Sequence, residues 1–386
     1  MDGHTGGRLM DIRLRGPVGW RWATAGVALA AVAIVGVTIV GVAPVAAAGP
    51  PPVLSSAAGT PVCQVRDGRL NEISGMAAVG DGFVVVNDGA DEEARRRIFF
   101  LDADCAVVRT VRYPSRPRDT EDLGVGADGT VWVADVGDND RSRRTVALWR
   151  LRPGGKRPVL YRLTYPDGPH DAEALLIAGD GRPVIVTKQG GGAGLYRPAA
   201  ALRPGATVPL TRVGQVRLPS TRTRNPFSFV GRAVVTGGAT APDGRRVVLR
   251  TYADAFEFDV SGGDVVAALT TGTPRVVPLP DEPQGESVTY SRDGRSLLTV
   301  SETAGQPPGT RPTILRYALT PTPTATRPRT DPTPAAPRGT DAPDRADRAD
   351  HGGVRSAVAG AAVAALALLV LGMARARGAG RQDKGK

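Results

Sequence analysis

Short runs of apolar and β-branched residues recur through the middle of the chain, and Gly, Pro or Asp-Gly bounds each of them. Alternating apolar runs of this length are typical of strands, and turn residues end them. No convincing helical periodicity is present between residues 49 and 319, so the pattern predicts an all-β domain over this range. The clearest runs are residues 83–87, 130–135, 183–188, 246–252 and 296–302.

These runs belong to a repeat, in which a strand, an Asp-Gly turn and a second strand follow one another. The turns fall at Asp81, Asp128, Asp180, Asp243 and Asp293, roughly 50 residues apart, and another apolar run follows most of them. A period of this length with about four strands predicts the blades of a β-propeller. Five blades are visible, and the longer spacing after Asp180 leaves room for a sixth. An open β-sandwich is the alternative, although sandwiches seldom repeat so regularly.

Two longer apolar segments flank the repeats. The first follows four arginines and ends in Ala46-Ala47-Ala48, which predicts a signal peptide over residues 1–48, or an uncleaved anchor. The second, within residues 354–374, predicts a transmembrane helix, with a buried core helix as the alternative. The basic residues 375–386 should remain in the cytoplasm, which places the domain at 49–319 outside the cell membrane. Residues 320–353, rich in Pro and Thr, predict a disordered stalk.

The chain has two cysteines, Cys63 and Cys105, and both lie outside the membrane in this topology. They predict one disulfide, because no Cys/His spacing indicates zinc. The segment from Cys63 to Leu70 could supply a strand that closes the ring of blades. A bond to Cys105, in the first blade, would then fasten that closure.

The net charge of +11 does not indicate nucleic-acid binding. Residues 1–48 and 320–386 contain 15 Arg or Lys against 8 Asp or Glu, so the folded region retains only +4. Its charges are scattered and form no basic helix or aromatic-interleaved patch. We therefore expect a membrane anchor and an extracellular protein or small-molecule ligand as partners, and no nucleic acid.

Carboxylates recur at one position of the repeat. Seven residues before each turn aspartate stand Glu121, Glu173, Thr236 and Glu286, and Glu72 stands nine residues before the first turn. The first strand of a propeller blade lines the central channel, so these positions predict a ring of glutamates at one mouth. The alternative is structural: the acids cap turns and pair with the many arginines of the rim.

The second strands should end beside the same mouth, because a hairpin returns to where it began. Crowded carboxylates repel one another unless a cation or protonation relieves them, and calcium, which prefers oxygen ligands, is the simplest relief. No EF-hand order of ligands is present. The predicted metal ligands are Glu72, Glu121, Asp122, Asp135, Asp138, Glu173 and Glu286. The predicted ligand-binding residues are Asn87, Asp88, His170, Lys188, Arg250 and Glu302. Adjoining loops contribute Asp119, Asn139, Asp140 and Asp171.

Several stretches carry a family resemblance over roughly residues 63–319. They are NEISGMA (71–77), VNDGAD (86–91), DTEDLG (119–124), DVGDND (135–140), DAEALL (171–176) and QGESV (284–288). With these stretches the chain resembles secreted bacterial β-propellers of the phytase-like and esterase-like group. The resemblance implies calcium-dependent attack on phosphate esters, with acidic residues on the metal and Lys188 and Arg250 on the phosphate. The DDPAxW-like acidic motif of well-characterised propeller phytases is absent.

Other catalytic patterns are weaker. The sequence contains no G-x-S-x-G motif, and His170 is the only histidine of the folded region, so a serine-histidine triad would depend on it. Otherwise His170 is a loop residue at the channel mouth. We therefore expect a calcium-containing binding module, with a metal-dependent phosphoesterase or esterase as the alternative. A purely structural envelope protein is the third hypothesis.

Overall fold

The computed structural model describes residues 58–320, which form a β-propeller-like fold. The predicted signal peptide, transmembrane helix and basic tail lie outside the described residues, as does the stalk apart from its first residue. Within residues 58–320, none of the helices has the length and apolar character needed to cross a membrane.

Antiparallel meanders succeed one another along the chain. The first sheet has the order β2 (Ile73–Val79), β3 (Gly82–Asn87), β4 (Arg97–Leu101) and β5 (Val107–Arg112). Another sheet has the order β14 (Gly237–Thr240), β15 (Arg246–Arg250), β16 (Asp254–Asp259) and β17 (Arg275–Pro278). The predicted strand runs coincide with β3, β15 and their counterparts in the other sheets.

An eight-stranded sheet contains two further meanders. One comprises β6 (Asp122–Val125), β7 (Val131–Asp135), β8 (Val146–Leu151) and β9 (Val159–Thr164). The other comprises β10 (Ala172–Ile177), β11 (Pro183–Thr187), β12 (Ala193–Pro198) and β13 (Thr207–Val216). Their outermost strands, β9 and β13, pair in parallel through Arg162–Thr164 and Thr207–Pro209. This pairing merges two meanders into one sheet.

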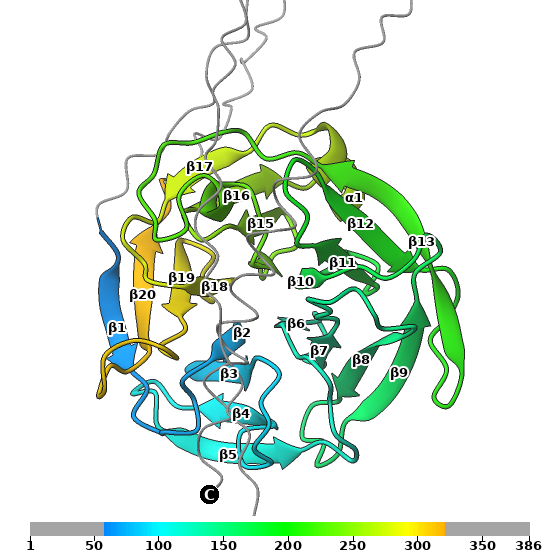
Figure 1. Cartoon of the computed structure of the whole chain (residues 1–386), viewed down its shortest axis with the longest axis horizontal. Coiled ribbons are helices and arrows are strands. Elements are labelled where there is room, and N and C mark those ends of the chain that lie inside the picture. The colour runs from blue at the N-terminus through cyan, green and yellow to red at the C-terminus, as the bar shows by residue number, and fades with distance from the viewer. Residues whose placement is uncertain (1–57, 321–386) are drawn as a thin grey trace, which may run out of the picture. The chain divides into compact units, whose positions relative to one another are not determined.

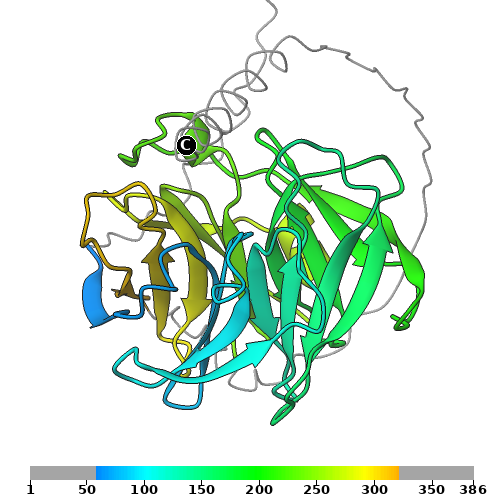
Figure 2. The same ribbon diagram turned by 60° about the horizontal axis from the view of Figure 1, so that its bottom comes forward.

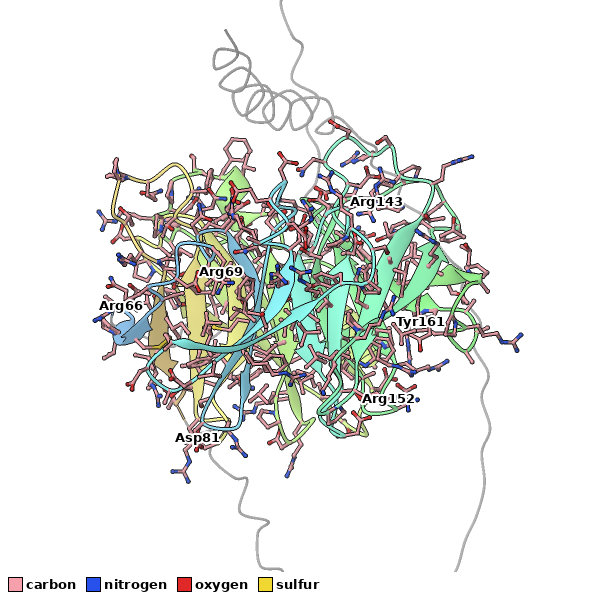
Figure 3. The ribbon with its side chains drawn as sticks, turned by 90° about the horizontal axis from the view of Figure 1, so that it is seen from below. Arg66, Arg69, Asp81, Arg143, Arg152 and Tyr161 are labelled. Carbon is pink, nitrogen blue, oxygen red and sulfur yellow. A yellow bond between two sulfur atoms is a disulfide. The ribbon has the colours of Figure 1, made fainter. Side chains whose placement is uncertain are left out.

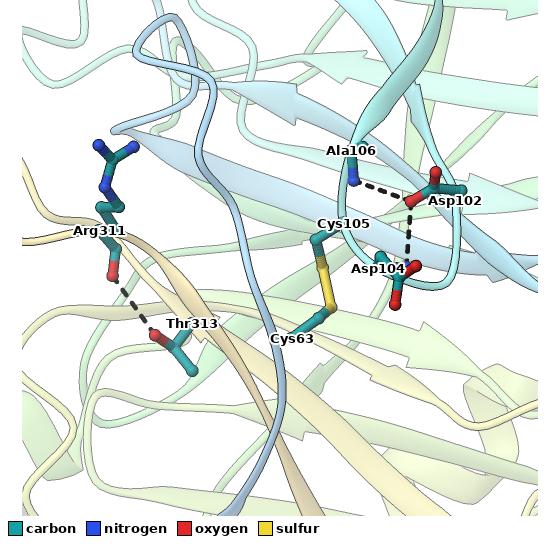
Figure 4. Close-up of a disulfide and its surroundings, with 7 residues drawn as sticks. All are labelled: Cys63, Asp102, Asp104, Cys105, Ala106, Arg311 and Thr313. Atoms are coloured by element: carbon teal, nitrogen blue, oxygen red, sulfur yellow. Dashed lines mark hydrogen bonds between the residues drawn. A yellow bond between two sulfur atoms is a disulfide. The ribbon is translucent and has the colours of Figure 1, made fainter.

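The last sheet joins the two ends of the described chain. Its order is β1 (Thr60–Gln64), β20 (Thr313–Ala318), β19 (Ser296–Ser301) and β18 (Gly285–Tyr290). An N-terminal strand thus completes a sheet made from C-terminal strands, as the sequence predicted, although β1 begins at Thr60 and ends at Gln64. The predicted disulfide is present: Cys63 of β1 is bonded to Cys105, in the turn between β4 and β5, with 5.8 Å between their Cα atoms (Figure 4).

Removing this disulfide should destabilise the fold, because it ties the last sheet to the first. The bond closes a loop with a sequence separation of 42. Constraint of the unfolded chain by a loop of that length corresponds to about 4 kcal/mol of unfolding free energy. We expect the double variant Cys63→Ala, Cys105→Ala to unfold at a clearly lower urea concentration, and the oxidised and reduced wild-type chains to differ likewise. Equal urea midpoints of unfolding would show that the disulfide does not stabilise the folded chain.

The inner strands form a closed ring, in which each contacts the next: β2, β6, β10, β14, β18 and again β2 (Figure 1). Five apolar clusters fill the spaces between neighbouring meanders. The cluster between the first and last sheets, for example, packs Ile73, Met76 and Phe99 against Val300 and Ile314. Within residues 58–320 the apolar contacts are therefore divided among these clusters, and buried polar side chains such as Glu121, Asp122 and Glu173 come from the inner strands and their starts.

Two features lie outside the meanders and were not predicted. The helix α1 (Val265–Thr271) connects β16 to β17, and its N-cap Asp264 accepts a hydrogen bond from the Ala267 amide. Residues 217–236 connect β13 to β14 and contain only the short helix η1 (Val230–Arg232). In Figure 2 this green segment stands above the ends of the strands. Its length accounts for the long spacing after Asp180, where the described chain has no additional strands.

Candidate metal centre

Three of the five inner strands begin with a β-bulge, and in the other two the residue just before the strand takes the equivalent position. The pairing of β2, β10 and β18 shifts at Ser74, Glu173 and Glu286. Glu121 and Thr236 immediately precede β6 and β14, and their amides donate to the partner strand at Ala134 and Arg250. The five side chains are almost fully buried, with exposed fractions between 0% and 4%.

The register gives the first meander a different residue from the one that the sequence suggested. Ser74, and not Glu72, occupies the bulge of β2, and its hydroxyl donates to Glu121 Oε2 at 3.4 Å. Glu72 instead pairs with the Arg95 guanidinium. The hydroxyl of Thr236 donates to the Gly285 carbonyl at 2.8 Å. The ring is therefore Ser, Glu, Glu, Thr, Glu.

Two further carboxylates, Asp119 and Asp171, stand two residues before Glu121 and Glu173. The structure brings the side chains together in two groups: Asp88, Asp119 and Glu121 in one, and Glu121, Asp171 and Glu173 in the other. Within each group, the candidate ligand atoms all lie within 4.8 Å of one another. Glu121 belongs to both groups, so five carboxylates form one continuous cluster, which we call the acidic cluster.

Glycines create the space that the acidic cluster occupies. A Cβ atom at position 137 would lie 2.0 Å from Glu121 Oε1 and 2.6 Å from Asp119 Oδ2. A Cβ atom at position 89 would lie 2.2 Å from Asp119 Oδ1. No real Cβ contact is this short, so Gly89 and Gly137 let the backbone approach the carboxylates closely.

Other acids of the predicted set hold the cluster in position. Asp135 accepts hydrogen bonds from the backbone amide of Asp119 at 3.0 Å and from the Trp149 indole at 3.2 Å. It also forms a buried ion pair with Arg143 at 2.8 Å. Asp138 accepts the amides of Ser142 and Arg143, and its own amide donates to Asp171 Oδ1 at 2.9 Å. Figure 3 shows Arg143 on the face of the ring opposite Asp81.

Asp122 does not belong to the acidic cluster, and its carboxylate accepts backbone amides instead. Its carboxylate accepts hydrogen bonds from the amides of Leu123, Leu175 and Gly238, on β6, β10 and β14. The side chain is 0% exposed. Three amide donors satisfy this carboxylate, so it ties three inner strands together.

Lys188 is the one cation in direct contact with the acidic cluster among the described residues. Its ammonium forms an ion pair with Glu173 Oε1 at 2.5 Å and lies 5.9 Å from the centre of the Tyr252 ring. Burial alone would lower the pKa of Lys188, but Glu173 raises that pKa well above its ordinary value. The lysine therefore stays charged and offsets one of the five carboxylates.

Four of the five carboxylates disfavour their ionised forms. Burial raises the pKa of Asp119 to about 8, and the neighbouring Asp88 adds to the shift. Burial, followed by the charge of Asp88, raises the pKa of Glu121 well above its ordinary value. Burial also raises the pKa of Asp171 and, despite Lys188, that of Glu173. Without a cation, the acidic cluster retains protons near neutral pH.

Glu286 lies in the same ring, outside both groups of candidate ligands. Its Oε1 accepts a hydrogen bond from Gln284 at 3.4 Å, whereas Oε2 is buried and has no hydrogen-bond partner among residues 58–320. Burial raises the pKa of Glu286 to about 7, against the opposing effect of Lys188. Gln284 also donates to Glu302, which is buried beside it.

The other predicted ligand-binding residues have local partners. Arg250 is fully buried, forms an ion pair with Glu282 at 3.0 Å and donates to the Ser287 carbonyl. The Asn87 side chain donates to the carbonyls of Arg69 and Arg95. The His170 ring lies 3.0 Å from both Asp167 and the Tyr196 hydroxyl, in an aromatic cluster outside the acidic one. Of the predicted ligand-binding residues, the structure thus brings only Asp88 and Lys188 to the acidic cluster. The loop residues Asn139 and Asp140 are exposed.

The donor set fits a hard cation. Calcium binds oxygen ligands at about 2.3 to 2.6 Å, so ligands on opposite sides of one ion lie up to about 5 Å apart. The separations within each group are no greater than 4.8 Å, and all donors are carboxylate oxygens. A divalent cation would also offset the burial and the mutual repulsion that raise these pKa values.

The raised pKa values predict how the stability of the cation-free chain depends on pH. A carboxyl whose folded pKa exceeds its unfolded pKa favours folding most fully below the unfolded value. That contribution is lost as pH rises through the folded values, which are about 7 for Glu286 and about 8 for Asp119. In a chelator, we expect the melting temperature to fall between about pH 4 and pH 8 and calcium to restore it above pH 7, as differential scanning fluorimetry would show. A flat profile would indicate that the carboxylates are already compensated.

Comparison with known proteins identifies no family for this chain. No family model matches it, and no curated protein matches it. Similar solved structures include an aldose sugar dehydrogenase from Streptomyces coelicolor in its PQQ-bound form, at 13% identity and a TM-score of 0.38, covering 70% of this chain and 99% of that one. A gluconolactonase from Xanthomonas campestris shows 15% identity and a TM-score of 0.37, over 72% and 99% of the two chains. Likenesses this distant carry no argument about function, and the phytase-like resemblance stays a prediction.

Proposed function

We propose that this protein binds a divalent cation of the calcium type in the acidic cluster and uses it to hold an oxygen-rich or anionic ligand at the mouth of the ring. One observation carries the proposal: two groups of buried or half-buried carboxylates share Glu121, and within each group the candidate ligand atoms lie no more than 4.8 Å apart. Lys188 supplies a single positive charge against five carboxylates, which leaves a strong local preference for a cation.

The wider setting is part of the proposal. We interpret the five meanders as five propeller blades, with β1 closing the last of them. We further propose that the protein is displayed outside the cell on a C-terminal membrane helix and a Pro/Thr stalk. The disulfide between Cys63 and Cys105 supports an extracytoplasmic location, because such bonds persist in oxidising compartments.

Isothermal titration calorimetry of the purified full-length chain with calcium chloride tests the cation site. We expect saturable binding together with a rise in melting temperature. Magnesium should bind more weakly, because it requires a near-octahedral shell that a rigid cluster of carboxylates does not readily provide. The proposal would be refuted if neither ion gave heat of binding on titration and neither raised the melting temperature.

Metal-dependent hydrolysis of an ester is the second candidate function, and Glu286 favours it. A buried carboxyl with an unpartnered oxygen and a pKa of about 7 can accept a proton near neutral pH. A bound divalent cation would polarise an ester oxygen and lower the pKa of a bound water. Calcium-stimulated release of p-nitrophenol from p-nitrophenyl acetate or p-nitrophenyl phosphate, lost in Glu286→Gln with calcium affinity unchanged, would establish this activity.

A further inference from the structure

A cavity of about 320 Å³ lies beside the mouth, and the acidic cluster does not use it. One wall is the glycine-rich loop after β11, including Gln189 and Gly192. Another wall comes from the segment that joins β13 to β14, residues 217–236, which we call the insertion. The lining of the cavity as a whole is mostly apolar and includes Val216, Leu218 and Val235. Cavities of roughly 300 Å³ and above are large enough for small organic ligands.

The insertion is held in place by hydrogen bonds to the buried Asp254 and within its own turn. The hydroxyls of Thr221 and Thr223 donate to the two oxygens of Asp254, at 2.5 and 2.6 Å. Asp254 is itself 0% exposed. Asn225 also fixes the next turn, since its side chain accepts the Phe227 amide and donates to the Ser228 carbonyl. The wall is therefore formed before any ligand arrives.

The cavity adjoins the mouth at both walls. Gln189 directly follows Lys188, and Val235 directly precedes Thr236 of the ring. The Phe227 ring of the insertion packs on Tyr252 at 4.4 Å, and Tyr252 in turn faces the Lys188 ammonium. A molecule in the cavity would thus lie next to the residues that flank the acidic cluster.

Two side chains of the lining indicate what the cavity binds. Phe229 is 57% exposed and is the one aromatic among the exposed large hydrophobic residues of the described chain. Exposed aromatic surface at a cavity rim favours contact with an apolar group. Arg232 also lines the cavity and forms no ion pair with a residue of 58–320, although its charge lowers the pKa of Asp254, which burial raises. Arginine pairs readily with carboxylates and other planar anions.

We propose that this cavity binds a small organic anion, with its apolar or aromatic body against Val216, Leu218 and Phe229 and its carboxylate paired with Arg232. The inference goes beyond the proposed cation site, because the cavity contacts need no ion. It also gives the insertion a function, which is to form one side of a ligand-binding cavity.

Binding of 2-naphthoate to the full-length chain, measured by isothermal titration calorimetry, tests this inference against the neutral analogue 2-naphthalenemethanol. We expect saturable binding of naphthoate, about tenfold tighter than the alcohol, because only the anion gains a charged hydrogen bond. The variant Arg232→Gln should remove that difference and leave the affinity for the alcohol within about twofold. Ser220→Trp, at an exposed position of the lining, should block both ligands without disturbing the core.

The outcomes separate this inference from the cation proposal. No saturable naphthoate binding, equal affinity for the two ligands, or full binding by Ser220→Trp would each overturn it. Both variants should bind calcium as the wild-type chain does. Naphthoate binding that obeys these expectations in a chain without calcium affinity would support the cavity while refuting the cation site.

Discussion

Glu121→Gln should weaken calcium binding by about 100-fold or more, because Glu121 is the carboxylate shared by both groups of candidate ligands. The amide keeps the size of the side chain but lacks the negative charge. Without calcium, the same variant should be more stable than the wild-type chain at pH 8, since burial and Asp88 disfavour the ionised form of Glu121. Calorimetric titration and melting curves measured with chelator and with calcium would test both effects.

The opposite signs of the two effects distinguish a cation site from structural pairing. If the glutamates only paired with neighbouring groups, Glu121→Gln would lower stability in chelator and change nothing on calcium addition. Asp81→Asn is a suitable control, because Asp81 is exposed at a turn on the opposite face (Figure 3) and also loses one negative charge. Calcium affinity should be unchanged in this control.

Strand pattern and turn chemistry were sufficient to predict a β-propeller-like fold of repeated meanders. Asp-Gly turns between alternating apolar runs specify hairpins, and their period revealed the repeated meanders. The parallel pairing of β9 with β13 and the helix α1 could not be predicted in this way. The first depends on contacts between meanders, and the second is a short segment whose apolar residues show no extended helical period.

The candidate site could be predicted only where counting residues back from the Asp-Gly turn gave the correct position at the start of the inner strand. Counting back from the turns found Glu121 and Glu173, but the bulge in β2 puts Ser74 at the position for which Glu72 had been chosen. An Asp-x-Glu repeat, at 119–121 and 171–173, carried the signal for Asp119 and Asp171, because each stands two residues before a glutamate that the turn spacing had already placed at the ring. The roles of Asp122 and Asp135 depend on backbone amides brought from other strands, which composition and spacing do not reveal.

Gly137→Ala should impair calcium binding without changing any charge. The added methyl group would lie 2.0 Å from Glu121 Oε1 and 2.6 Å from Asp119 Oδ2, so at least one carboxylate must move. A displacement of this size removes ligands from a cation whose bonds are about 2.3 to 2.6 Å long, and we expect at least tenfold weaker binding by calorimetry. Gly68→Ala is the matched control, because a Cβ atom there would have no neighbour within 4 Å.

A compensating change makes the test specific. Glu121→Asp shortens the side chain that collides with the new methyl group, so the double variant Gly137→Ala, Glu121→Asp should bind calcium more tightly than Gly137→Ala alone. Glu121→Asp by itself should weaken binding, since it withdraws a ligand from an otherwise intact cluster. Rescue of this kind requires that the Glu121 carboxylate occupy the space above Gly137 when the ion binds. Additive losses in the double variant would instead indicate that the glycine serves only the backbone of the loop after β7, and that the ion is bound elsewhere.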